Sequence, residues 1–191
     1  MKRTSRMLIV AAIVAALAGG NLRPASAAAA NATVTISSGG LTLTTQSGSV
    51  DFGTVALTGD NQTVDATSSP TFRVKDATAS NAGWNVTFSA SNFSDGGSNT
   101  IANTNFSFNP TGGTITALSG QAVDASNGPK ETGGGAVDMS SARKVVTTAA
   151  GYGKGRYDYT PAAGNFGLTI PATTLAANYT STLTATVASG P

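Results

Sequence analysis

The residue types available for chemistry in this chain are hydroxyls, carboxylates and amines, because the sequence contains no histidine and no cysteine. Ser-His and Cys-His pairs, which activate nucleophiles in many hydrolytic enzymes, are therefore excluded. Ordinary zinc sites, which are built from the same two residue types, are excluded as well. Glu131 is the single glutamate, so catalysis could proceed only through paired aspartates. We expect a protein that is not an enzyme and that carries no cofactor.

Calcium is the one metal that the sequence leaves open, since loop carboxylates, amides and hydroxyls are its usual ligands. Two short stretches carry such groups, namely "SDGGSN", with Asp95, Ser98 and Asn99, and "DASNG", with Asp124, Ser126 and Asn127. Neither stretch matches an EF-hand loop, and Asp-Gly and Asn-Gly sequences are also ordinary turn formers. Turns are the interpretation that we favour, and we predict no metal site.

The N-terminal residues 1–27 have the three parts of a secretory signal peptide. A basic start precedes an apolar run from Met7 to Ala18, and the small residues that follow end at Ala27. The run is shorter than the roughly 20 residues that span a bilayer. We predict removal of residues 1–27 and a single domain over 28–191, which is not membrane-spanning once mature. The protein is then expected to be secreted.

Removal of the leader changes the charge balance of the chain. Residues 1–27 hold four of the 11 basic residues, so seven basic residues face nine acidic ones, and the net charge falls near −2. A nucleic-acid-binding domain would instead show clustered Lys and Arg on its folded part. We expect no nucleic-acid partner.

Apolar residues after the leader recur with period two, which is typical of β-strands, and no long window has the helical period. Many short strands without intervening helices predict an all-β fold, an antiparallel β-sandwich with Greek-key (Ig-like) connections. The Gly-rich segment 120–141 is predicted to be a long loop. The predicted strands are 32–37, 41–45, 54–58, 62–66, 71–76, 84–90, 105–108, 114–118, 143–148, 156–160, 166–170 and 179–187.

The only tryptophan, Trp84, opens the predicted strand 84–90. It alternates in phase with Val86, Phe88 and Ala90, which favours a core position. Burial of an aromatic ring hides about 150 to 250 Å². A chain without disulfides and with 6% aromatic residues gains much stability from that burial. The position at the start of the strand also allows a second role, stacking on a sugar ring or on a partner protein.

Three stretches in this order resemble the WxL domain, a family found on the surface of Gram-positive bacteria. They carry an Asp-Phe-Gly, a Gly-Trp-x-Leu-like strand and a Tyr-Thr-x-Thr-Leu-Thr-like strand. The likeness extends over roughly residues 35–191, and Ala185 stands where the second motif has its tryptophan. The stretches are "VDFGTVALTGDNQTV" from Val50 to Val64, "GWNVTFSAS" from Gly83 to Ser91, and "LTIPATTLAANYTSTLTATVASGP" from Leu168 to Pro191.

The resemblance implies a surface protein that associates non-covalently with the cell wall. The implied partners are peptidoglycan or another wall glycopolymer and a membrane-anchored WxL-interacting protein, and the implied location is the extracellular surface or wall of a Gram-positive bacterium. The implied binding residues are those that match the two motifs: Trp84, Val86, Tyr179, Leu183 and Val187.

A second function remains open beside wall binding. The Thr-, Ser-, Gly- and Ala-rich composition and the long predicted strands near both ends are also compatible with a structural subunit of a secreted fibre or surface layer.

Overall fold

The computed structural model describes residues 33–191, of which Ser37–Pro191 form one compact unit. The predicted leader, residues 1–27, lies outside the described residues. Within residues 33–191, no helix has the length and apolar character needed to cross a membrane.

The described chain consists of β-strands and two short 3-10 helices, η2 (Asn103–Asn105) and η3 (Ala163–Asn165). The strands are β1 (Leu41–Ser47), β2 (Gln62–Asp65), β3 (Thr71–Asp76), β4 (Trp84–Ala90), β5 (Phe93–Ser94), β6 (Thr100–Ile101), β7 (Phe106–Phe108), β8 (Thr114–Gly120), β9 (Lys130–Glu131), β10 (Val137–Asp138), β11 (Arg143–Thr147), β12 (Gly155–Thr160), β13 (Phe166–Ile170) and β14 (Leu183–Ser189).

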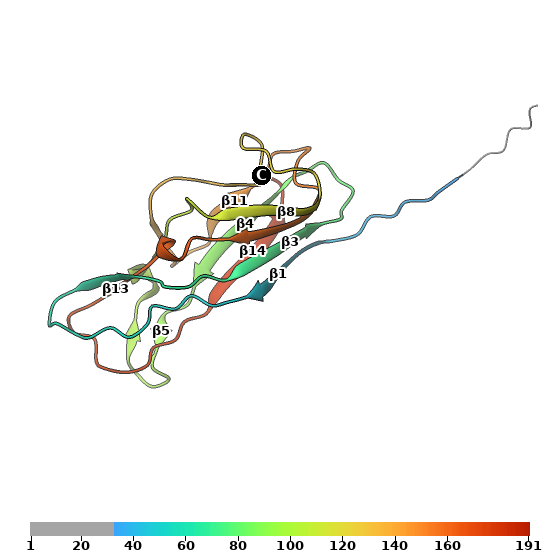
Figure 1. Cartoon of the computed structure of the whole chain (residues 1–191). Helices are drawn as coiled ribbons and strands as arrows, with labels where there is room; N and C mark the ends of the chain where they lie inside the picture. The colour runs from blue at the N-terminus through green and yellow to red at the C-terminus, as the bar shows by residue number, and fades with distance from the viewer. Residues whose placement is uncertain (1–32) are drawn as a thin grey trace, which may run out of the picture. The chain divides into compact units, whose positions relative to one another are not determined.

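Three four-stranded antiparallel sheets and one two-stranded ribbon, β5-β6, make up the unit (Figure 1). The sheet orders are β1-β3-β12-β8, β14-β4-β11-β9 and β10-β7-β13-β2. Every strand pair is antiparallel, so the prediction of an all-β antiparallel fold is confirmed. The Greek-key order of connections stays a prediction.

Aromatic rings from all three sheets meet in one core. The ring of Phe88, on β4, lies 4.9 Å from that of Phe72 on β3 and 5.3 Å from that of Phe108 on β7. Phe166, on β13, packs against Phe108 with the rings tilted and their centroids 4.6 Å apart. The sheets therefore pack face to face, as expected of a sandwich. The strict alternation of buried and half-buried residues along β4 shows how the period of two in the sequence produces this core.

Three of the strands predicted from the sequence differ from the structure. Residues 33–37 and 54–58 contain no strand, although their sequences alternate as strands do. The last strand begins at Leu183 rather than at residue 179. A strand needs a neighbouring edge for its backbone hydrogen bonds, and residues 33–37 and 54–58 have none within the described residues. Thr180 does pair with Ser94, but only as an isolated bridge before β14 begins. Local alternation therefore overpredicts pairing at residues 33–37 and 54–58.

The Gly-rich segment 120–141 connects β8 to β11 and contains two short strands. Its β9 pairs with β11, and its β10 pairs with β7. Met139, directly after β10, is fully buried, and its N–H donates a hydrogen bond to the Phe106 carbonyl at 2.8 Å. The segment is thus attached to two sheets.

Candidate functional site

Two of the sequence motifs become neighbouring strands, because β4 and β14 pair along their whole length. The register places Val86 opposite Val187 and Ala90 opposite Leu183. Residues opposite each other in an antiparallel pair share a face of the sheet. Leu183 and Val187 are half-buried against the core that holds Val86. The two motifs therefore contribute one continuous apolar face, although nearly 100 residues separate them in the sequence.

The environment of Trp84 is closed on every side. Its side chain is 1% exposed, and its ring lies 6.0 Å from that of Tyr157. The indole N–H donates to the Gly153 carbonyl at 2.8 Å, as a buried indole requires. The backbone N–H of Trp84 donates to the hydroxyl of the buried Thr148 at 2.7 Å. The structure assigns this ring to the core.

The opposite face of the same sheet is lined by hydroxyls and amides. Thr184 lies opposite Ser89 and Thr186 opposite Thr87, and both β14 threonines are exposed. The neighbouring strand β11 adds Lys144, which is exposed and lies opposite Thr87. We call this the hydroxyl face, and it consists of Asn85, Thr87, Ser89, Lys144, Thr147, Thr184 and Thr186.

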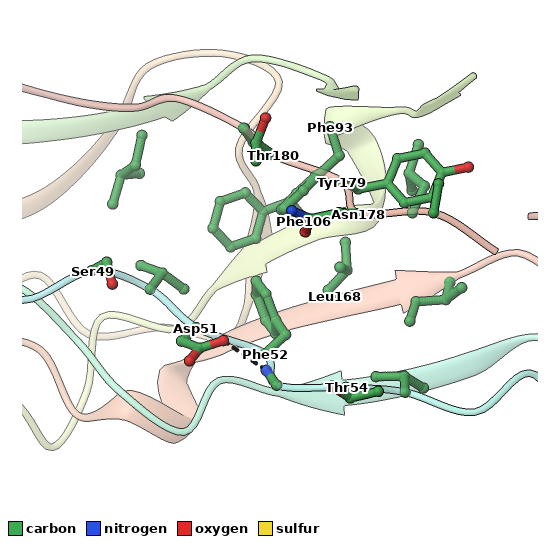
Figure 2. A pocket seen from close by; sticks show the side chains of 18 of the residues that line it. Ser49, Asp51, Phe52, Thr54, Phe93, Phe106, Leu168, Asn178, Tyr179 and Thr180 are labelled. Carbon is green, nitrogen blue, oxygen red and sulfur yellow. Dashed lines mark hydrogen bonds between the residues drawn. The ribbon is translucent and has the colours of Figure 1, made fainter. Parts of the chain in front are cut away.

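A second feature, an apolar groove of about 790 Å³, lies between the β1–β2 connection and the β13–β14 connection. Figure 2 shows Asp51, Phe52 and Thr54 on one side and Asn178, Tyr179 and Thr180 on the other. Its floor is formed by the core residues Phe72, Phe93, Ile101, Phe106, Leu168 and Ile170.

Among residues 33–191, Asp51 is the only charged residue that lines the groove. Its carboxylate accepts a hydrogen bond from the N–H of Gly53 at 2.8 Å (Figure 2), so it serves the turn of the Asp-Phe-Gly sequence. Phe52 of the same sequence packs edge-on against Phe93 and Phe106, with ring centroids 6.1 and 5.7 Å away. The motif thus shapes the groove wall and leaves the groove almost uncharged.

Tyr179 is the one implied binding residue outside β4 and β14, and it lines the groove, as does Leu183 at the start of β14. It is half-buried, and its hydroxyl donates to the Leu175 carbonyl at 3.1 Å. Leu175 itself is 60% exposed. The five residues implied by the sequence are therefore divided between the core face of one sheet and the rim of the groove.

In the two candidate calcium stretches, the carboxylates of Asp95 and Asp124 accept hydrogen bonds from neighbouring residues of the same stretch. The Asp95 carboxylate accepts from the Asn99 amide at 2.6 Å and from the Gly97 N–H at 2.8 Å, which lowers the pKa of that carboxyl. The N–H groups of Asn127 and Ser126 lower the pKa of Asp124 in the same way. Both stretches have the hydrogen bonds of Asx turns. Among residues 33–191 no three His, Cys, Asp or Glu side chains gather as a metal site.

Residues 141–144, "SARK", have the Ser-x-x-Lys spacing of a known class of acyl-transfer nucleophiles, a match that calls for a structural test. In this chain they lead into β11, where residues three apart point to opposite sides of an extended backbone. Ser141 and Lys144 are both exposed, and no hydrogen bond joins them. The geometry does not bring this pair together.

Comparison with known protein families found a match over residues 23–191 to the model described as "WxL domain surface cell wall-binding". The match covers nearly the whole chain. The chain belongs to the WxL family. Comparisons with curated proteins and with solved structures each found no match.

Membership in the WxL family confirms the expectation raised by the motifs and makes the chain a cell-surface, cell-wall-binding type of domain. The structure shows where the two motif positions of this family lie in the fold. In this WxL domain the tryptophan of the first motif, Trp84, is a packing residue. Ala185, which stands in place of the tryptophan of the second motif, lies opposite the buried Phe88. Sequence reasoning missed the hydroxyl face as a candidate surface, although the Thr alternation of residues 180–186 was its signal.

Proposed function

We propose that this protein is a secreted, non-catalytic surface protein that binds the Gram-positive cell wall non-covalently, and that the hydroxyl face is its contact with the wall polymer. The supporting observation is the orientation of the motif strands. Because Trp84 and Val86 pack inward, the side chains that alternate with them are available for binding.

The motif residues Trp84, Val86, Leu183 and Val187 act in this proposal as positioning residues. Their burial holds β4 and β14 in register, and that register sets the spacing of Thr87, Ser89, Thr184 and Thr186 on the other face. Neighbouring strands lie about 4.8 Å apart, and alternate residues of one strand about 7 Å apart. The result is a regular grid of hydroxyls.

The chemistry of this face suits a glycan such as peptidoglycan. Hydroxyl and amide side chains can donate and accept hydrogen bonds with sugar hydroxyls and acetamido groups. The charged residues at outward positions of these strands are Lys144 and Lys130, both cations, and they suit the anionic groups of a wall polymer. We further propose a membrane-anchored WxL-interacting protein as a partner, on the strength of the family resemblance.

Sedimentation with isolated Gram-positive walls tests the proposal. Purified protein is expected to sediment with the walls. The double variant Thr184→Glu/Thr186→Glu should stay in the supernatant, because two carboxylates replace the two exposed hydroxyls that β14 contributes to the face. Thr114→Glu/Thr116→Glu is the matched control, since these threonines have the same spacing on β8, an exposed edge strand of another sheet.

The control variant is expected to sediment as the unchanged protein does. Recovery of the unchanged protein in the supernatant would contradict wall binding itself. Equal binding by the two double variants would leave wall binding intact and overturn the assignment of the face.

A further inference from the structure

Residues 33–38, "TVTISS", have the pattern of a strand but pair with no strand among the described residues. Val34 and Ile36 are each 82% exposed, the highest exposure among the large apolar residues described. They alternate with Thr33, Thr35 and Ser37, so an extended backbone would present both apolar side chains on one side. Because the segment is exposed, uncharged and alternates apolar with hydroxyl side chains, it can pair as an additional strand with the edge of another sheet.

The groove has unpaired backbone on both of its walls. Within residues 33–191, the N–H groups of Thr54 to Leu57 donate no hydrogen bond, and neither do those of Leu175 to Tyr179. Both walls come from stretches whose sequences are strand-like or directly precede a strand, yet neither belongs to a strand. An extended peptide laid between them would find donors and acceptors along its length.

The groove and the segment also match in polarity and charge. The groove has a volume of about 790 Å³, and Phe72, Phe93, Phe106 and Leu168 line it. Apolar side chains of an inserted peptide would therefore contact apolar side chains of the groove. Asp51 is the single charged residue that the described part of the chain contributes to the lining, and residues 33–38 contain no charged residue. A polar or charged peptide would lose its hydration there without finding a partner.

We infer that residues 33–38 of one copy insert as a β-strand into the groove of a second copy, with Val34 and Ile36 pointing toward Phe106 and Leu168. The contact joins two different surfaces, the N-terminal segment and the groove. Such a head-to-tail contact can repeat from copy to copy and so extend into a linear chain of subunits. This inference does not depend on wall binding, and it gives the fibre function a structural basis.

The course of the chain before β1 favours a second copy over insertion into the same molecule. The Gly39 N–H donates to the Ala77 carbonyl at 2.6 Å, and Gly40 accepts from the Ala77 N–H at 3.1 Å. These bonds continue the β1–β3 ladder beyond Leu41. The groove lies at the other end of β1, where Thr45 and Gly48 line it, about 20 Å away at 3.3 Å per residue.

Size-exclusion chromatography with light scattering over a range of concentrations tests the contact. The unchanged protein is expected to form oligomers whose mass grows with concentration. Val34→Asp/Ile36→Asp should raise the dissociation constant at least about tenfold, because two charges would enter an apolar groove without partners. Both positions are exposed, so the variant should fold and melt as the unchanged protein does.

Thr33→Asp/Thr35→Asp is the matched control, because it adds the same charge at the same spacing on the other side of the strand. It is expected to associate like the unchanged protein. A monomer at all concentrations would overturn the inference, and so would equal loss of association in both double variants.

Disulfide cross-linking identifies the acceptor surface, since the natural sequence contains no cysteine. Ile36→Cys mixed with Ala177→Cys, on the exposed groove wall, should give a mixed dimer under mild oxidation. Ile36→Cys mixed with Leu118→Cys, on the exposed edge strand β8, is the control and should give little. Equal yields would overturn the groove as acceptor. Rapid internal cross-linking of an Ile36→Cys/Ala177→Cys double variant, as a monomer at low concentration, would overturn insertion between copies.

Discussion

The indole N–H of Trp84, at the start of β4, donates a hydrogen bond to the carbonyl oxygen of Gly153, just before β12, at 2.8 Å. The two strands lie in different sheets, so this bond joins the two layers of the sandwich. Gly153 is itself buried, and the indole is the partner that satisfies its carbonyl. The family's signature residue thus connects the layers of the fold.

Trp84→Ala is expected to lower the free energy of unfolding by about 3 to 5 kcal/mol, because it leaves a large cavity and an unpaired buried carbonyl. Urea denaturation followed by circular dichroism measures the change. Trp84→Phe serves as the comparison, since it keeps an aromatic ring and removes only the indole N–H and part of the volume. Its loss should be smaller. Unchanged unfolding of Trp84→Ala together with loss of wall binding would show that the ring is a contact residue.

Gly83→Ala should destabilise the protein more than Gly53→Ala. Both glycines have a left-handed backbone, with φ of 73° and 68°, a conformation that costs other residues about 1 to 2 kcal/mol. A β-carbon at Gly83 would also lie 2.5 Å from the Thr148 carbonyl oxygen, whereas one at Gly53 meets nothing within 4 Å. Thermal melting of the two variants isolates the steric effect, and equal melting temperatures would contradict it.

Stability should fall at alkaline pH because of Tyr159. Burial, with the neighbouring Glu131 carboxylate, raises the pKa of its hydroxyl well above the ordinary value near 10, and the hydroxyl donates to Glu131 at 2.8 Å. The unfolded chain therefore loses this proton first, and the stabilisation present below pH 10 is lost above it, at about 1.4 kcal/mol per pH unit for one group.

Urea denaturation at a series of pH values up to about 11 checks this dependence. Tyr159→Phe should be less stable at neutral pH, because Glu131 loses a donor, but its stability should decline less steeply above pH 10. Tyr157, whose pKa burial also raises, accounts for a remaining slope. Identical slopes for the variant and the unchanged protein would exclude Tyr159 as a contributor.

Stability should also fall in acid because of Asp158. The Arg73 guanidinium binds this carboxylate through two hydrogen bonds of 2.7 Å across β3 and β12, which lowers the pKa of Asp158. The group therefore stabilises the fold above its unfolded pKa near 4, and this contribution disappears as the pH falls through its lower folded pKa. Asp158→Asn should flatten the acid part of the stability curve. A curve of unchanged steepness would contradict this role.

Much of the fold could be predicted from side-chain alternation. Residues 71–76 and 84–90 were predicted as strands with their observed bounds, because a strand buried on one face alternates apolar and polar residues along its sequence. The short strands β5 and β10 were missed, since two residues carry no period. The hydroxyl face was not predicted as a binding surface, because it combines residues of β4, β11 and β14 that only sheet pairing brings together.

By itself, the sequence determined the absence of His and Cys chemistry, the all-β class and the order of the WxL motifs, because residue types and local periods can be read without knowing any partner. Only the tertiary structure decided that Trp84 joins two layers, that Val86 lies opposite Val187, and that residues 54–57 wall an open groove instead of forming a strand. The physical reason is that strand pairing and burial depend on edges and surfaces supplied by distant parts of the chain.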